Sequence, residues 1–144
     1  MWRSDVTSAE EFQIKGRESS EVSLKKDADG IAVGISVTGS LESDVVRYLQ
    51  REQINVRALC FLAPMGSPGR TALRSDRDAV ALARQCKEHI QRWSREREAK
   101  IVHLFYFGPL AGAAFLGHML NAVGAAIQVY EDQAPGYAPS FFLR

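Results

Sequence analysis

From residue 31 onward, short apolar runs alternate with segments of helical periodicity. Runs rich in β-branched residues predict buried strands, at residues 31–39, 56–64, 100–108 and 125–131, with a short fifth at 140–144. The segments between them predict helices, at residues 40–52, 75–95 and 109–123. This β-α-β order predicts an α/β fold, a Rossmann-like three-layer sandwich with a mainly parallel sheet and right-handed crossovers.

The sequence also predicts how the first two helices begin and which side they bury. Ser40 or Ser43 can cap the first helix, with acidic residues in its first turn. Its predicted inner face consists of Val45, Val46 and Leu49. Ser75 and Asp78 resemble a capping box for the second helix. The apolar residues of this helix recur at helical spacing, at Ala79, Ala83, Cys86, Ile90 and Trp93.

The first thirty residues differ from the rest because they are polar. Short alternations at Phe12–Lys15 and Glu21–Lys25 are compatible with edge strands. We therefore expect two parts, a polar linker or edge-strand segment over residues 1–30 and a folded unit over residues 31–144. The polar segment has no apolar signal-peptide core, so we expect a cytoplasmic protein.

Residues 101–130 contain no charged side chain, and an uncharged segment of this length could cross a bilayer. Gly108-Pro109 and Gly124 divide this run into strand, helix and strand of globular length, which favours burial in a soluble domain. Only His118 and Asn121 interrupt the apolar surface of the predicted helix. A helix that is apolar all round needs cover on more than its sheet face, so we expect it to pair with another copy or a missing partner domain.

Composition excludes several functions. Eighteen basic and 17 acidic residues give a net charge of +1, which does not favour general nucleic-acid binding. Cys60 and Cys86 lie in apolar patterns and are expected to be buried free thiols in a reducing compartment. His89, His103 and His118 lack the spacing of metal ligands, and His103 is expected to be an in-strand residue. We expect no metal, no cofactor and no catalytic nucleophile–base pair, so a binding domain is favoured over an enzyme.

In an open parallel sheet, ligands bind where the loops leave the carboxyl ends of the strands. Three predicted loops contain groups suited to an anion: hydroxyls beside Gly39, the guanidinium groups of Arg70 and Arg74, and the helix start after Phe107. Structural explanations for these residues remain open, because the glycines can simply make tight turns and the arginines can be solvated surface residues. Neither a dinucleotide fingerprint nor a Walker lysine is present.

The stretch "HLFYFGPLAGAAFLGHMLNAVGAAIQVYE", followed by "YAPSFFL", closely resembles the end of the SAVED domain. "IAVGISVTGSLESDVVRYL" is similar to the unit that opens the second half of that domain, and "MWRSD" resembles the stretch joining its halves. The resemblance implies a CARF-like, Rossmann-like half of a sensor that binds cyclic oligonucleotide second messengers in bacterial antiviral defence (CBASS and type III CRISPR systems). Partners would be a second SAVED half, another copy of the chain or an effector domain.

Carried onto this sequence, the resemblance implies two ligand loops, and our electrostatic reasoning adds a third group. The expected ligand-binding residues are Thr38, Gly39, Ser40, Leu41, Phe107, Gly108, Pro109, Leu110 and Ala111, with Arg70 and Arg74 added on charge alone. Two alternatives remain: a ring nuclease that cleaves cyclic oligoadenylate, and an assembly module without a ligand.

Overall fold

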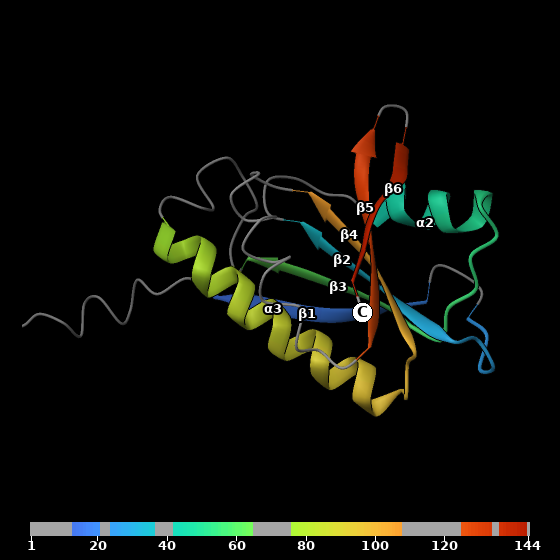
Figure 1. Ribbon diagram of the computed structural model, residues 1–144, viewed down its shortest axis with the longest axis horizontal. Helices are drawn as coiled ribbons and strands as arrows, with labels where there is room; N and C mark the ends of the chain where they lie inside the picture. Colours follow the sequence, from blue (N-terminus) through green and yellow to red (C-terminus); the bar gives the residue numbers. More distant parts are fainter. Residues whose placement is uncertain are drawn as a thin grey trace, which may run out of the picture.

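Six strands form one sheet in the order β1-β3-β2-β4-β5-β6, with a helix on each face (Figure 1). The computed structural model describes residues 13–20, 24–36, 42–64, 76–107, 125–133 and 136–143. Its elements are β1 (Ile14–Ser19), β2 (Gly30–Ser36), α2 (Glu42–Arg51), β3 (Leu59–Pro64), α3 (Asp76–Glu96), β4 (Ile101–Phe107), β5 (Ala126–Gln133) and β6 (Gly136–Leu143).

The centre of the sheet is parallel and its two edges are antiparallel. β3, β2, β4 and β5 run parallel to their neighbours, as predicted, whereas β1 pairs antiparallel with β3 and β6 antiparallel with β5. The edge strand β1 overlaps the first alternation in the polar N-terminal segment. β6 is eight residues long, longer than the expected short strand, because it forms a hairpin with β5. The predicted Rossmann-like sandwich is confirmed.

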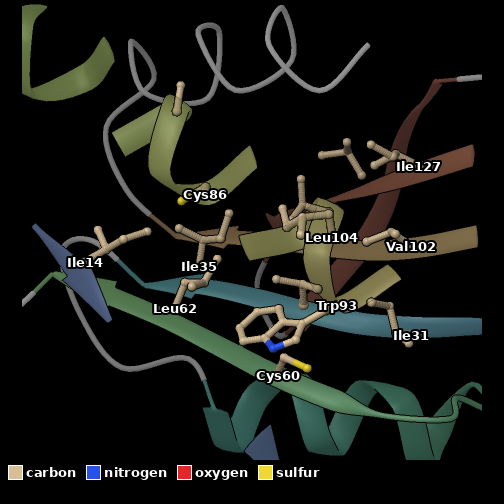
Figure 2. Packing of buried hydrophobic residues seen from close by; sticks show 14 of the residues in the cluster. Ile14, Ile31, Ile35, Cys60, Leu62, Cys86, Trp93, Val102, Leu104 and Ile127 are labelled. Atoms are coloured by element: carbon tan, nitrogen blue, oxygen red, sulfur yellow. The ribbon is translucent and has the colours of Figure 1, made fainter. Parts of the chain in front are cut away.

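The α3-side core is the larger of two hydrophobic clusters. Every second residue of the central strands points to this face, among them Ile31, Val33 and Leu104, and all are buried. From α3, Cys86 and Trp93 point into the same cluster (Figure 2). The periodicity predicted for this helix is confirmed at Ala83, Cys86, Ile90 and Trp93, which are all buried.

The α2-side core lies on the opposite face and is aromatic. Tyr48 of α2 packs against Phe105 and Tyr130, with ring centroids 5.7 and 5.4 Å away. The predicted inner face of α2 is confirmed, because Val45 and Leu49 are buried and the half-buried Val46 packs against the same cluster. The prediction lacked Tyr48, which is buried against its aromatic partners on β4 and β5.

Both cysteines are buried free thiols, as predicted. Cys60 lies on β3 and Cys86 on α3, and both belong to the α3-side core. Burial raises the pKa of the Cys60 thiol to about 12 and also raises the pKa of Cys86. Neither thiol therefore forms a thiolate near neutral pH.

The amino ends of the strands are tied together by backbone and arginine hydrogen bonds. Arg57 donates through Nε to the carbonyl of Ala28 and through Nη1 to the carbonyl of Arg97, 2.7 Å away. The N–H of Arg57 also donates to the carbonyl of Gly30 at 2.7 Å. A Cβ on Gly30 would come within 2.5 Å of the Ile101 carbonyl oxygen, so only glycine fits between β2 and β4 here.

Both helices end in the same way at this amino end. Gln53 after α2 and Glu98 after α3 adopt positive φ angles of 55° and 51°. The following N–H groups, of Ile54 and Ala99, donate back to carbonyls five residues earlier at 3.0 and 2.9 Å. This is the Schellman arrangement, here with a non-glycine residue in the left-handed position.

Several predictions fall on residues that the structure does not describe. They are the helix over 109–123 with its expected partner contact, Ser40 as a cap, and Ser75 in the capping box. Ser43 is the second residue of α2, so it lies within the helix and is not its cap. Within the described ranges, no helix is long and apolar enough to cross a bilayer.

Candidate functional site

The candidate site lies at the carboxyl ends of β2 and β4. The chain passes from β2 to β3 on one side and then returns to β4 on the other side of β2. A parallel sheet that reverses direction in this way has a topological switch point, here between β2 and β4, where ligands bind in such folds. The two strands end level with one another, because Ser36 pairs with Phe107.

The expected ligand loops attach at this switch point. Residues 38–41 follow β2, which ends at Ser36, and residues 108–111 follow β4, which ends at Phe107. The strand β3, whose end leads toward Arg70 and Arg74, is the other neighbour of β2. All three attachment points are therefore at the same edge, with the two loops implied by the resemblance on adjacent strands.

Only one of the eleven expected site residues, Phe107, is within the described part of the chain, as the last residue of β4. The others lie outside it: Thr38, Gly39, Ser40, Leu41, Arg70, Arg74, Gly108, Pro109, Leu110 and Ala111. Their contacts with a ligand stay predictions.

The start of α2 carries charged groups on the same face of the sheet as the Ser36 side chain, over the edge strand β1, which is separated from β2 by β3. Glu42 forms an ion pair with Arg17 of β1, and Asp44 lies 3.5 Å from Arg47. The Arg17 guanidinium also lies over the Phe61 ring, 5.2 Å from its centroid, while its side chain is 57% exposed. Each acidic residue of the first turn is thus matched by an arginine, which suits the start of a helix whose dipole favours anions. Sequence reasoning missed Arg17, because a polar edge strand gives little periodic signal.

Ser36 is the second group that the sequence did not single out. Its Oγ is buried at the end of β2 and has no hydrogen-bond partner, the one such side-chain atom in the described part of the chain. Its register places it on the α2 side of the sheet, two residues beyond Gly34. A small polar residue at the end of an otherwise apolar strand is the signal that could have pointed to it.

An aromatic stack forms the floor beneath the switch point. The Phe105 and Tyr130 rings are parallel to within 9°, with centroids 4.4 Å apart. Tyr130 OH lies 2.7 Å from Nδ1 of His103, which confirms that His103 is an in-strand residue. Burial lowers the pKa of His103 and raises the pKa of Tyr130 to about 12. Burial thus favours the neutral forms of both groups, and their hydrogen bond joins β4 to β5.

A shallow hollow of about 430 Å³ lies on the outer side of α2. It is lined by Ser43, Val46, Arg47 and Gln50. These residues follow helical spacing along one stripe of α2, which borders the inner face at Val46. The hollow is therefore a groove beside the helix and not a pocket at the strand ends.

One protein-family model matches almost the whole chain. The profile of SAVED, the SMODS-associated and fused to various effectors sensor domain, matches residues 1–143. The chain belongs to the SAVED family. SAVED domains are sensor domains by this description, and the resemblance seen in the sequence is confirmed.

Solved structures similar to this SAVED chain include the Acinetobacter baumannii Cap4 SAVED/CARF-domain containing receptor. One structure is 21% identical, with a TM-score of 0.66, and the match covers 95% of this chain and 27% of that chain. Two others hold cyclic trinucleotides. The receptor with 2'3'3'-cAAA is 21% identical with a TM-score of 0.66, and the receptor with 3'3'3'-cAAA is 20% identical with a TM-score of 0.68; both matches cover 91% of this chain and 27% of that chain.

These matches support the fold and not the ligand contacts of this SAVED chain. The chain spans about a quarter (27%) of the length of the solved receptors that it matches. A search of curated proteins finds no match. The shared CARF-like fold confirms the expected architecture, because the receptors and this chain superpose over nearly all of the shorter chain.

Proposed function

We propose that this SAVED chain binds a cyclic oligonucleotide of the oligoadenylate type at the switch point between β2 and β4. The observation that carries the proposal is the register of Ser36 with Phe107, which starts the two expected ligand loops on adjacent strands. Support also comes from the similar Cap4 receptor, which has been solved with two cyclic trinucleotides.

The charges at the start of α2 suit the phosphates of such a ligand. Arg17 is preoriented by its contact with the Phe61 ring and by its ion pair with Glu42. A guanidinium group can hold a phosphate through two parallel hydrogen bonds, and the N–H groups at a helix start favour the same charge. The Arg17 guanidinium has further N–H donors for an arriving phosphate while it stays paired with Glu42.

Binding, rather than chemistry on the ligand, is the proposed role. In the described part of the chain the half-buried histidine beside the floor, His103, is already paired with Tyr130. The messenger would then act by changing how the chain contacts a partner. We propose a second SAVED half, another copy of the chain or an effector domain as that partner, with an antiviral effector triggered through oligomerisation.

Calorimetry with 3'3'3'-cAAA and 2'3'3'-cAAA tests the ligand. We expect saturable binding of at least one ring and at least tenfold weaker binding of linear trinucleotide. Lack of binding to both rings by the full chain together with its partner half would contradict the proposal.

A pair of charge variants tests the place of binding. Arg17→Ala is expected to weaken ring binding about fivefold, because one charge-assisted contact is lost. Arg95→Ala is the control: it removes the same charge from an exposed position on α3, on the opposite face of the sheet. Equal losses in the two variants would show a general charge effect in place of a site at the switch point.

A further inference from the structure

We infer that the hydroxyl of Ser36 is a ligand-binding group, which donates a hydrogen bond to a phosphate oxygen of the bound cyclic nucleotide. The inference rests on the proposed function and names a group that neither the sequence pattern nor the family resemblance assigned. It starts from one observation: the buried Oγ of Ser36 has no hydrogen-bond partner within the part of the chain that the structure describes.

A buried hydroxyl without a partner destabilises the folded state. Packing alone does not explain a serine here, since its neighbours along β2 on both faces are apolar or glycine, from Ile31 to Ile35. An alanine would fill nearly the same volume and leave no polar atom unpaired. A group that is unfavourable for folding at a candidate site is therefore a candidate for binding.

The position of Ser36 matches the proposed ligand. It is the last residue of β2, two residues before Thr38, and it pairs with the last residue of β4, Phe107. Its side chain lies on the α2 side of the sheet. This is the side on which Arg17 and Glu42 meet at the start of α2.

Charge on this face of the sheet favours a phosphate over a neutral group. Arg17 and the first-turn N–H groups of α2 attract an anion, and the acidic residues of that turn are matched by arginines. A hydroxyl can donate a hydrogen bond to a phosphate oxygen. A hydrogen bond to a charged acceptor is stronger than one to a neutral acceptor. The Ser36 hydroxyl would thus obtain the partner that the fold does not supply.

Two properties of the Ser36→Ala variant test the inference together. We expect the affinity for 3'3'3'-cAAA to fall about tenfold, because a charge-assisted hydrogen bond is lost. In the absence of nucleotide we expect the melting temperature to stay the same or rise, because the unpaired hydroxyl is gone. Weaker binding combined with undiminished stability separates a binding role from a structural one.

Two matched variants complete the experiment. Ser36→Thr keeps the hydroxyl and is expected to bind within about threefold of the original chain. Ser20→Ala removes an exposed hydroxyl just after β1, at the amino end of β3, and is expected to change neither property.

Each outcome has one meaning. If the original chain binds the ring and Ser36→Ala binds equally well, the Ser36 inference is wrong and the proposed function stands. If Ser36→Ala unfolds at a clearly lower temperature, the hydroxyl has a structural partner such as a buried water, which also overturns the inference. If the original chain with its partner half binds neither cyclic trinucleotide, the proposed function itself fails and the inference fails with it.

Discussion

The two ends of the sheet differ in how fully their polar groups are hydrogen-bonded. At the amino end, Arg57 joins three parts of the chain through the carbonyls of Ala28 and Arg97 and its own N–H, and Gly30 allows β2 and β4 to approach closely. At the carboxyl end, the Ser36 hydroxyl is buried without a partner among the described residues. Complete hydrogen bonding favours stability, whereas an unpaired polar group leaves capacity for a ligand. Changes at the amino end should therefore alter unfolding, and changes at the carboxyl end should alter binding.

The largest effect is expected from Gly30→Ala. A methyl group there meets the backbone carbonyl of Ile101, which cannot move without separating β2 from β4. We expect a loss of about 3 kcal/mol in the free energy of unfolding, measured by urea titration. Gly16→Ala is the comparison, because its methyl group meets the Trp93 and Leu62 side chains, which can shift. An equal or smaller loss for Gly30→Ala would contradict the close approach at the amino end.

Arg57→Ala comes next in size. It leaves two carbonyls without their charged donor, so we expect a loss of about 2 kcal/mol in the free energy of unfolding. Arg57→Lys keeps the charge but cannot reach both carbonyls, and an intermediate loss is expected. Binding of cyclic trinucleotide should be unchanged in both variants. A change in affinity without a change in stability would mean that the two ends do not divide their roles in this way.

A pH effect on stability is expected from His103, which lies between the two ends of β4. Burial lowers the pKa of His103 below its usual 6.5, so the unfolded chain takes up a proton more readily than the folded chain. This contribution to stability is fully present above pH 6.5 and is lost as the pH falls toward the lowered pKa. In His103→Gln we expect the melting temperature to decrease less between pH 7.5 and 5.5 than in the original chain. The pKa of His89 on α3 is also lowered, by burial and by Arg92, so His89→Gln is expected to reduce the pH dependence as well. A parallel decrease in the original chain and in His103→Gln would rule out a contribution of His103.

The smallest effect is expected at the end of α3. Glu98 adopts a left-handed conformation, which is unfavourable for a residue with a side chain. Glu98→Gly should stabilise the chain by about 0.5 kcal/mol, since relief of this strain exceeds the added freedom of the unfolded chain. Glu96→Gly, in the last turn of α3, should instead destabilise it by about 0.5 kcal/mol. Thermal unfolding of the two variants would show opposite shifts; shifts of the same sign would contradict the role of this turn.

Most of the sheet could be predicted from the sequence because its central strands are buried on both faces. Runs such as Ile31–Ile35 are apolar on both sides and carry the signal by themselves. The edge strand β1 could not be placed, because only Ile14 is buried in an otherwise polar strand. Helical periodicity identified the valines and the leucine of α2 but not Tyr48, whose burial depends on aromatic partners on the sheet.

The sequence predicted where the expected loops leave the sheet but not which strands are neighbours. The β-α-β pattern predicts parallel strands with their loops at one edge, and the structure adds that β2 and β4 are adjacent and end level, with Ser36 paired to Phe107. The roles of Ser36 and Arg17 depend on burial and on contacts between residues far apart in the chain, such as Arg17 with Glu42 and Phe61. A linear pattern contains no signal for such contacts.

The two buried thiols give the chain an internal probe of its own motion. Cys60 belongs to β3 and Cys86 to α3, and both face the core between that helix and the sheet (Figure 2). Modification by a thiol reagent requires exposure and a thiolate, and burial suppresses both. The labelling rate of these cysteines therefore measures how often α3 separates from the sheet. Comparing that rate with and without cyclic trinucleotide would reveal whether binding at the strand ends changes how often α3 separates from the sheet.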